Sequence, residues 1–330
     1  MLEATIKPIV IRQVWLRQRL STISGYMPKS FNKFLVRRPW QILPSSEVDF
    51  FEAENSTLVP FALSRSSIGQ RTLTTYRIID RSERTPPLTV WIYQNETTTT
   101  TGVIPLAEDA RVFQFGDSLY IYYQVAVRRE GDFLDCDIYI FDPTRSISLP
   151  ILSPFPFNGK NWIPYEYQSS LFFVYSLQPL IVLRTTEWTD EGLLLELVYS
   201  DENGSPKQLV WGDNLGFFGG IRGGSQLISL GDHEYLAFTH TTPSGVLKFS
   251  HQAGSLLFNA DNFTYKHIYL SSLKPGLLVD PFGIQIEAGA IEMSYSYSVN
   301  NPHEVSSIVG SSIATFNLSD ILYRFKYKAV

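Results

Sequence analysis

Alternation of apolar and polar side chains is the dominant pattern along this chain. Several runs place an aliphatic or aromatic residue at every second position, and a period of two predicts β-strands rather than helices. Five such runs stand out: Leu58–Arg65, Ser118–Val127, Leu171–Leu177, Glu234–His240 and Ala290–Val299. The pattern therefore predicts an all-β fold.

The five runs recur at a nearly constant interval. Their centres lie at Phe61, Ile121, Val174, Ala237 and Tyr295, with spacings of 60, 53, 63 and 58 residues. A repeated period of this kind is typical of repeat architectures. Four strands with their turns fill about sixty residues, which is one propeller blade. We therefore predict a five-bladed β-propeller over residues 41–330; the alternative is a β-sandwich with coincidental spacing.

The composition agrees with a β fold that needs no covalent staples. Aromatic residues make up 14% of the chain and charged residues only 18%, and aromatic side chains suit a pleated, half-buried surface. A chain of 330 residues buries a large share of its surface on folding. The single Cys136 argues against a disulfide framework or a cysteine metal site. No His, Asp and Glu cluster has metal-ligand spacing, so we expect no metal and no cofactor.

Charge divides the chain into two parts. Residues 1–40 hold eight Lys/Arg and one acid, Glu3, which gives +7, so the remainder carries −12 of the total −5. We predict a basic N-terminal extension over residues 1–40 that packs on or near the propeller. The amphipathic pattern of residues 9–20 leaves open a peripheral membrane or partner contact. The net negative charge does not indicate nucleic-acid binding.

Targeting signals are the next consideration. The sequence contains no run of eighteen apolar residues, so it predicts no transmembrane helix. The first apolar run is interrupted by Lys7 and Pro8 and followed by Arg12, which does not fit a signal peptide. These observations favour a cytoplasmic location.

Short polar blocks precede four of the five runs. They are residues 108–111 (EDAR), 160–162 (KNW), 222–225 (RGGS) and, closer to its run, 286–289 (IEAG). Equivalent positions of successive blades are related by rotation about the propeller axis, so these polar groups are expected to converge on one axial funnel. Charges that converge there must pair with one another or with a ligand, because burying isolated charges is costly.

The same blocks resemble a family of carbohydrate-active propellers. EDAR resembles the Glu-Asp-x-Arg motif of the β-mannoside phosphorylases and hydrolases, glycoside hydrolase family 130. IEAGA and the following SYSVNNPHEV resemble two further segments of that family. The blocks that begin KNWIP and RGGS resemble those of related propellers, some of which are glycosyltransferases. The resemblance covers residues 105–305 and implies a five-bladed propeller that acts on sugars.

The chain departs from the family pattern at one acidic position. Where the family has an Asn-Asp pair, this sequence has Asn300 and Asn301, and Ser298 stands where the family has glycine. The loss of a carboxylate makes hydrolysis by two carboxyl groups harder to support.

The resemblance also implies roles for individual residues. Asp109 is the candidate catalytic acid or base. Arg111, Lys160 and Arg222 would supply positive charge for a phosphate or a nucleotide diphosphate. Trp162 offers a face on which a sugar ring can stack. The remaining candidates for substrate binding are Glu108, Asn161, Ser225, His240, His251, Glu287 and Asn301.

Three functions are consistent with these features. An inverting glycosyltransferase would use a nucleotide sugar or sugar phosphate as donor and a glycan as acceptor; the cation-rich funnel and the missing carboxylate favour it. A β-glycoside phosphorylase or hydrolase is favoured by the EDAR and IEAGA blocks. A non-catalytic propeller that binds glycans or partner proteins is consistent with the fold alone, since fold does not fix function.

Overall fold

The protein is described by a computed structural model. The described residues are 44–53, 57–82, 89–94, 101–129, 133–155, 159–201, 220–241, 251–270, 278–299 and 307–328. The predicted basic extension over residues 1–40 lies outside the described residues, and so does Asn301. Their predicted roles therefore stay predictions.

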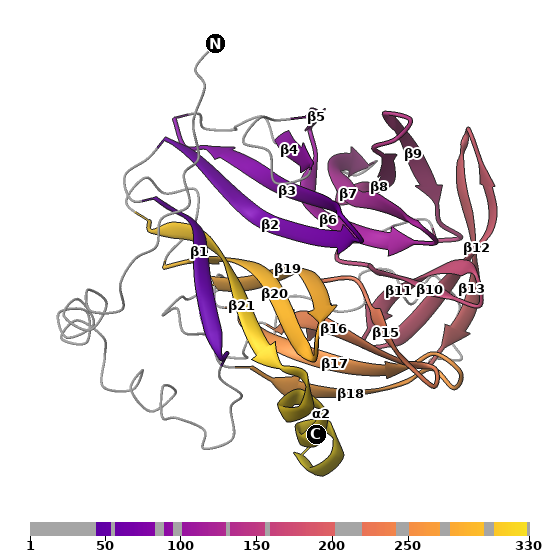
Figure 1. The fold of residues 1–330 in the computed structure, drawn as a ribbon. Coiled ribbons are helices and arrows are strands. Elements are labelled where there is room, and N and C mark those ends of the chain that lie inside the picture. The colour runs from indigo at the N-terminus through magenta and orange to yellow at the C-terminus, as the bar shows by residue number, and fades with distance from the viewer. Residues whose placement is uncertain are drawn as a thin grey trace, which may run out of the picture.

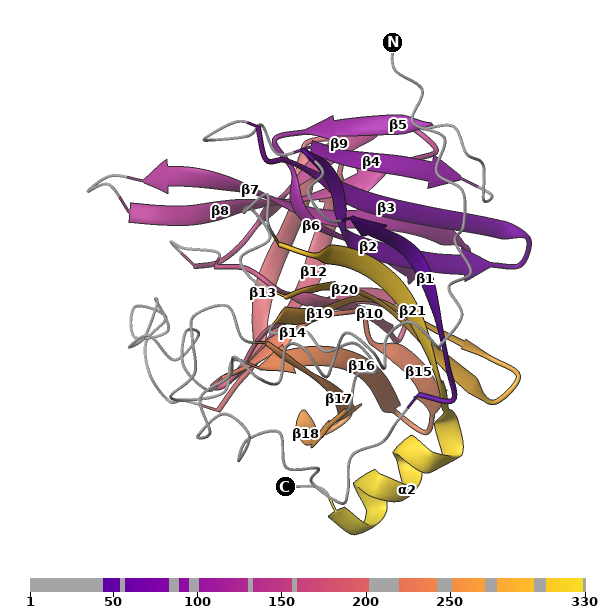
Figure 2. The same cartoon turned by 90° about the vertical axis from the view of Figure 1, so that its left-hand side faces the viewer.

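The described strands fall into five antiparallel groups, which we call sheets (Figures 1 and 2). Leu193 and Leu194 pair in parallel with Ile151 and Leu152, and this short contact joins the second and third groups into one eight-stranded sheet. The first sheet contains β2 (Leu58–Ile68), β3 (Arg71–Asp80), β4 (Thr89–Gln94) and β5 (Gly102–Pro105). The second contains β6 (Glu108–Phe115), β7 (Ser118–Arg129), β8 (Phe133–Asp142) and β9 (Ile147–Leu152). The third contains β10 (Ile163–Tyr167), β11 (Ser170–Leu177), β12 (Leu180–Thr189) and β13 (Gly192–Ser200).

The last two sheets complete the set. In the fourth, β14 (Ile221–Gly223) and β15 (Ile228–Gly231) both pair with β16 (Glu234–Thr241), followed by β17 (Gln252–Asn259) and β18 (Thr264–Tyr269). The fifth contains β19 (Leu278–Glu287), β20 (Ala290–Ser298), β21 (Val309–Asn317) and β1 (Ser46–Ala53). The strand nearest the N-terminus thus forms the outer edge of the last sheet and brings the two ends of the described chain together.

The sheets are arranged as a closed ring. One of the first strands of each sheet contacts the neighbouring sheet: β2 contacts β6, β6 contacts β10, β11 contacts β14, β16 contacts β19, and β19 contacts β2. Ring closure through β1 and β21 protects sheet edges that would otherwise pair with other chains. This is the five-bladed β-propeller that the periodicity predicted.

Apolar residues fill the spaces between neighbouring blades. One cluster joins the second and third blades around Phe113 and Phe173, and another joins the fourth and fifth around Phe238 and Tyr295. Each face of a blade therefore packs on the next, which explains why the strands read as alternating or continuous apolar runs.

One detail of the predicted repeat is corrected. In the hydrogen-bonded order of each blade, the centres Ile121, Val174, Ala237 and Tyr295 lie in the second strand, whereas Phe61 lies in β2, the first strand. The residues of β2 are buried on both faces. The strand therefore has the same apolar pattern as the second strands of the other blades, and the sequence does not distinguish the two positions.

The segment directly after β21 forms the 11-residue helix α2 (Leu318–Lys328). The Oδ1 atom of Asn317 accepts a hydrogen bond from the Ser319 N–H at 3.1 Å, which caps the helix start. Ile321 and Phe325 of α2 are buried in the cluster between the fourth and fifth blades. Within the described residues, no helix has the length and apolar character needed to cross a membrane.

Candidate functional site

A β-bulge at the start of β6 re-aims two acidic side chains. The pairing of β6 with β7 shifts register between Glu108 and Arg111, and Asp109 has a positive φ of 47°. In a regular strand, neighbouring side chains point to opposite faces, but here both carboxylates reach one cation. Arg77 Nη1 lies 3.7 Å from Glu108 Oε2 and 3.4 Å from Asp109 Oδ1.

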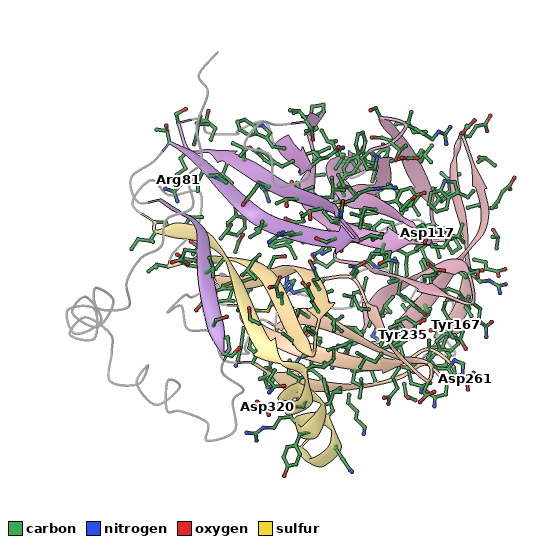
Figure 3. The ribbon with its side chains drawn as sticks, viewed as in Figure 1. Arg81, Asp117, Tyr167, Tyr235, Asp261 and Asp320 are labelled. Atoms are coloured by element: carbon green, nitrogen blue, oxygen red, sulfur yellow. The ribbon has the colours of Figure 1, made fainter. Side chains whose placement is uncertain are left out.

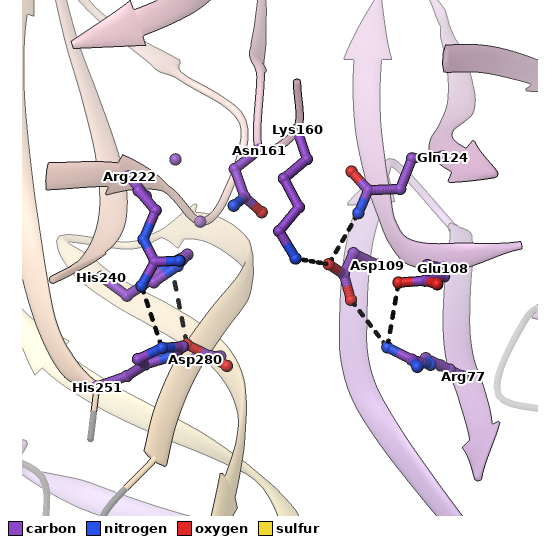
Figure 4. A network of polar contacts seen from close by, with 12 residues as sticks. Arg77, Glu108, Asp109, Gln124, Lys160, Asn161, Arg222, His240, His251 and Asp280 are labelled. Carbon is purple, nitrogen blue, oxygen red and sulfur yellow. Dashed lines mark hydrogen bonds and ion pairs between the residues drawn. The ribbon is translucent and has the colours of Figure 1, made fainter. Parts of the chain in front are cut away.

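These residues belong to a group that we call the carboxylate cluster: Arg77, Glu108, Asp109, Gln124 and Lys160 (Figure 4). Gln124 Nε2 donates to Asp109 Oδ2 at 3.0 Å, and Lys160 Nζ lies 3.9 Å from the same oxygen. The Asp109 side chain is 13% exposed and the Lys160 side chain 47% exposed. Asp109 is therefore nearly buried, and its carboxylate is held from three directions.

The two acids have opposite electrostatic environments. Burial alone would raise the pKa of Asp109, but Lys160, Arg77 and Arg111 together hold it below its ordinary value. Burial raises the pKa of Glu108, and the Asp109 charge adds to that effect against the opposing influence of Arg77. Asp109 is thus kept ionised, while Glu108 holds its proton to a higher pH.

Arg111 lies behind this cluster as a fully buried guanidinium. It donates to the Gly224 carbonyl, to Asn161 Oδ1 at 2.8 Å, and to the carbonyls of Gly223 and Asp109 at 3.4 and 3.3 Å. These contacts bind the second, third and fourth blades to one another. The predicted contact of Arg111 with a substrate phosphate is not available in this arrangement, because its donors face protein oxygens.

The Gly223-Gly224 pair permits this convergence. A Cβ atom at Gly223 would overlap the Asn161 carbonyl oxygen, and one at Gly224 would crowd the carbonyl oxygens of Phe238 and Pro281. The backbones of three blades therefore approach one another only because these positions lack side chains.

The segment before β10 presents Lys160 toward the cluster. The Gly159 N–H donates to Asp135 Oδ1 at 3.1 Å, and Asn161 adopts a positive φ of 68°. Trp162, predicted as a sugar-stacking surface, is fully buried and packs against Phe173 with ring centroids 5.8 Å apart. Its ring is part of the core and has no free face for a sugar in this structure.

A second polar group, the histidine cluster, contains Arg222, His240, His251 and Asp280 (Figure 4). Arg222 lies directly opposite His240 in the pairing of β14 with β16. His251 precedes β17, and its carbonyl accepts from the Val279 N–H at 3.3 Å, which brings the start of β19 alongside it. Asp280 Oδ1 lies 2.6 Å from His251 Nδ1 and 4.0 Å from His240 Nδ1.

His240 is the most enclosed member of this cluster. Its side chain is 6% exposed, and its ring stacks on that of His251 with centroids 5.0 Å apart. Burial lowers the pKa of His240 well below its ordinary value, and the charges of Arg222, Arg111 and Lys160 act in the same direction. His240 is therefore neutral near pH 7 and feels positive charge from both clusters.

Three groups of the histidine cluster have the geometry of potential metal ligands. One ligand atom each from His240, His251 and Asp280 lie within 4.8 Å of one another. Two imidazoles and a carboxylate are ligands that several transition metals accept. The sequence did not indicate this group, because its members are brought together from two blades.

Two predicted site residues lie elsewhere. Glu287 is exposed at the far end of β19, seven residues from Asp280, which is about 23 Å along an extended strand. Ser225 is fully buried, and its hydroxyl accepts from the Phe238 N–H at 2.8 Å, so it fixes backbone. Glu287 is thus corrected from the funnel to the opposite end of its strand.

Arg77, Gln124 and Asp280 were not anticipated. Arg77 and Gln124 lie on second strands, where no polar block marks them. Asp280 did have a signal: it lies fifteen residues before the Tyr295 centre, as Arg222 does before Ala237. The block at 286–289 lies closer to its centre than the other three blocks do to theirs. This shorter spacing indicates that Asp280, rather than residues 286–289, is the counterpart of the other three blocks.

Comparison with known proteins places this arrangement within one fold. No family model and no curated protein sequence matches the chain. A hypothetical protein from Leishmania major aligns with TM-score 0.52 and 10% identity, covering 88% of this chain and 93% of the other. MPT-1, a GDP-Man-dependent mannosyltransferase from Leishmania mexicana, aligns with TM-score 0.50 and 12% identity, covering 87% and 93%.

A third solved structure, described as a glycoside hydrolase, aligns with TM-score 0.51 and 11% identity, covering 88% of this chain and 96% of the other. At these identities the likeness concerns the fold. The predicted resemblance to carbohydrate-active propellers is confirmed at that level: the chain has the fold of five-bladed propellers that include a mannosyltransferase and glycoside hydrolases.

Proposed function

We propose that this protein is a carbohydrate-active enzyme, and that it is an inverting glycosyltransferase which takes an activated sugar at the axial site. The observation that carries the proposal is the Asp109 carboxylate, which is nearly buried, lies 3.9 Å from Lys160 Nζ and has its pKa held below the ordinary value by neighbouring cations. An ionised carboxylate in that position is suited to accept a proton from an incoming hydroxyl group.

The transfer step uses both clusters. Asp109 accepts the acceptor's hydroxyl proton as that oxygen forms a bond to the anomeric carbon of the donor sugar. The bond from the anomeric carbon to the donor's phosphate oxygen breaks, and the leaving phosphate keeps the electron pair. Lys160 and Arg222 stabilise the charge that develops on this leaving group. Inversion follows from attack on the face opposite the leaving group.

Charge supports a phosphate-bearing donor. Guanidinium and ammonium groups bind phosphate oxygens strongly, and Lys160 is exposed enough to reach a ligand. The solved structure of MPT-1 is described as that of a GDP-Man-dependent mannosyltransferase, which makes a nucleotide sugar the first donor class to test.

A β-glycoside phosphorylase or hydrolase is the second candidate. The sequence argued against it because Asn301 replaces an expected acid, but Asp280 supplies a second carboxylate beside Arg222 and the histidines. Two carboxyl groups flanking one bond are what glycoside hydrolysis requires. In that case Asp109 would face the sugar on one side and Asp280 the incoming phosphate or water on the other.

The deciding experiment is a donor screen across nucleotide sugars with nucleotide release as the readout. Release that depends on an acceptor glycan and is lost in Asp109→Asn supports the transferase. Phosphate-dependent release of a sugar 1-phosphate from a β-linked disaccharide would establish the phosphorylase instead. Binding of glycans without turnover of any donor or disaccharide would contradict both and leave a non-catalytic glycan-binding propeller.

A further inference from the structure

The histidine cluster contains an unbroken chain of hydrogen bonds. Arg222 Nη2 lies 3.1 Å from His251 Nε2, and His251 Nδ1 lies 2.6 Å from Asp280 Oδ1. Arg222 and His251 belong to the fourth blade and Asp280 to the fifth. The chain therefore crosses the boundary between two blades, and each of its two links joins groups of suitable polarity.

Chemistry fixes the direction of both hydrogen bonds. A guanidinium group has only donors and stays protonated in proteins, so Arg222 donates and His251 Nε2 must accept. A neutral imidazole has one donor and one acceptor nitrogen, which leaves the proton of His251 on Nδ1. That N–H then donates to Asp280, and the hydrogen bond at one nitrogen selects the tautomer at the other.

We propose that His251 and Asp280 are positioning residues that hold Arg222 as a fixed cation for an oxyanion of the substrate, and that the group is not a metal centre. The ligand class rests on the proposed function. The hydrogen-bond chain itself does not.

Metal binding would require a different protonation pattern. To coordinate an ion between His240 and Asp280, His251 would have to present an unprotonated Nδ1 and move its proton to Nε2. That N–H would then face the donor groups of Arg222, which has no acceptor to offer. In addition, Arg222, Arg111 and Lys160 create a positive potential at His240, and the same potential opposes a divalent cation.

His240 completes the site on the other side. Its Nδ1 is buried and has no hydrogen-bond partner among the described residues, and it lies 4.0 Å from Asp280 Oδ1. A buried polar atom without a partner is costly. An oxyanion bound to Arg222 would lie beside both rings, where a neutral His240 can offer one N–H. The arrangement thus favours an anion over a cation.

The first test measures the tautomer directly. Histidine labelled with ¹⁵N gives only five ring systems in this chain, and long-range proton–nitrogen correlation spectra distinguish the two neutral tautomers. We expect His251 to be protonated at Nδ1, with assignment by loss of its signals in His251→Gln. An Nε2–H tautomer, or a shift of the His240 and His251 signals by one equivalent of Zn²⁺, would overturn the proposal.

The second test measures binding of inorganic phosphate and GDP by calorimetry. Asp280→Leu removes the acceptor for His251, and we expect roughly tenfold weaker binding of both probes, as the loss of a hydrogen bond to a charged group predicts. Asp280→Asn keeps an oxygen that can accept from Nδ1–H and should weaken binding less. Asp117→Leu removes the same charge from an exposed turn at the other end of β6 (Figure 3) and serves as the control.

The outcomes separate the two proposals. If Asp280→Leu and Asp117→Leu bind the probes equally well, Asp280 does not position Arg222. If the wild-type protein binds neither phosphate nor GDP but His251 has the expected tautomer, the oxyanion is wrong and the phosphate-bearing donor of the proposed function falls with it. Binding of the probes without any sugar transfer would overturn the proposed function alone.

Discussion

The carboxylate cluster and the histidine cluster lie on either side of Asn161 (Figure 4), yet they are built in different ways. In the first, a bulge turns two consecutive acids toward Arg77, and cations outweigh the cost of burial at Asp109. In the second, Arg222, His251 and Asp280 form a single chain of hydrogen bonds. The carboxylate cluster keeps the Asp109 charge available for reaction, whereas the hydrogen bonds of the histidine cluster fix the orientation of Arg222.

This difference assigns chemistry to one side and binding to the other. A general base must be ionised and must not be consumed by a fixed partner. Asp109 meets this condition at its Oδ1 atom, whose contact with Arg77 is long at 3.4 Å, while its Oδ2 atom accepts from Gln124 at 3.0 Å and lies 3.9 Å from Lys160. Asp280, at 2.6 Å from His251, is committed to its partner. Variants of the two aspartates therefore test the comparison most directly.

The largest effect is expected from Asp109→Asn. Loss of the base should lower the turnover of whichever sugar reaction the screen identifies by about 10²-fold to 10⁴-fold. Asp280→Asn, which keeps an acceptor for His251, should affect the affinity for the donor more than its turnover. Steady-state kinetics on both variants, with folding checked by circular dichroism, measure the difference. Equal losses of turnover would show that the two clusters share the chemistry.

The next largest effect is expected for Arg111→Met, and it concerns the free energy of unfolding. Arg111→Met removes a buried guanidinium that donates to Asp109, Asn161 and the two glycine carbonyls. Leaving those acceptors unsatisfied should lower the free energy of unfolding by about 3 kcal/mol or more. Urea denaturation followed by tryptophan fluorescence gives the value.

Arg184→Met is the matched control for that experiment. Arg184 pairs with Glu196 on an exposed part of the third blade, and such pairs contribute only about 0–1 kcal/mol. A similar small loss for Arg111→Met would mean that the three blades are held at the axis by packing alone.

The sequence predicted the fold better than it predicted the site. Each blade buries equivalent faces against its neighbours, so the apolar pattern repeats once per blade. The period of about sixty residues therefore predicts the number of blades. The EDAR block located Glu108 and Asp109 correctly at the start of an inner strand. The bulge that turns both toward Arg77 depends on a positive φ at a non-glycine residue, for which the sequence has no marker.

Burial was the other quantity that the sequence could not supply. Arg111, Trp162 and Ser225 have the chemistry of ligand contacts, but all three are fully enclosed where the blades converge. These three residues hold the blades together around the site and do not contact a ligand in this arrangement. Conversely, Arg77 and Gln124 reach Asp109 only because the first blade and a second strand lie beside the bulge.

A smaller effect should come from Lys160→Met, which removes the charge that both clusters feel. Lys160 lowers the pKa of Asp109 and also contributes to the low pKa of His240. Both pKa values should therefore rise in the variant, that of Asp109 more because the charge lies 3.9 Å away. Carboxyl ¹³C and imidazole ¹⁵N titrations measure the two shifts. A shift at Asp109 with none at His240 would show that the clusters are electrostatically separate.

The smallest effect is expected from Glu108→Gln, and its sign is the informative part. Because burial raises the folded-state pKa of Glu108, the glutamate stabilises the fold fully only below its unfolded pKa of about 4.3, and this contribution is lost as pH rises through the folded pKa. Asp109 behaves oppositely: its lowered pKa stabilises the fold above the ordinary pKa of aspartate, and this contribution is lost as pH falls.

Glu108→Gln should therefore be more stable than wild type near pH 7, with the difference vanishing below about pH 4. Urea unfolding at a series of pH values measures this, and Glu292→Gln, on β20 away from both clusters, is the control. If Glu108→Gln is instead less stable at neutral pH, the ion pair with Arg77 outweighs burial, and Glu108 is a second ionised carboxylate beside Asp109.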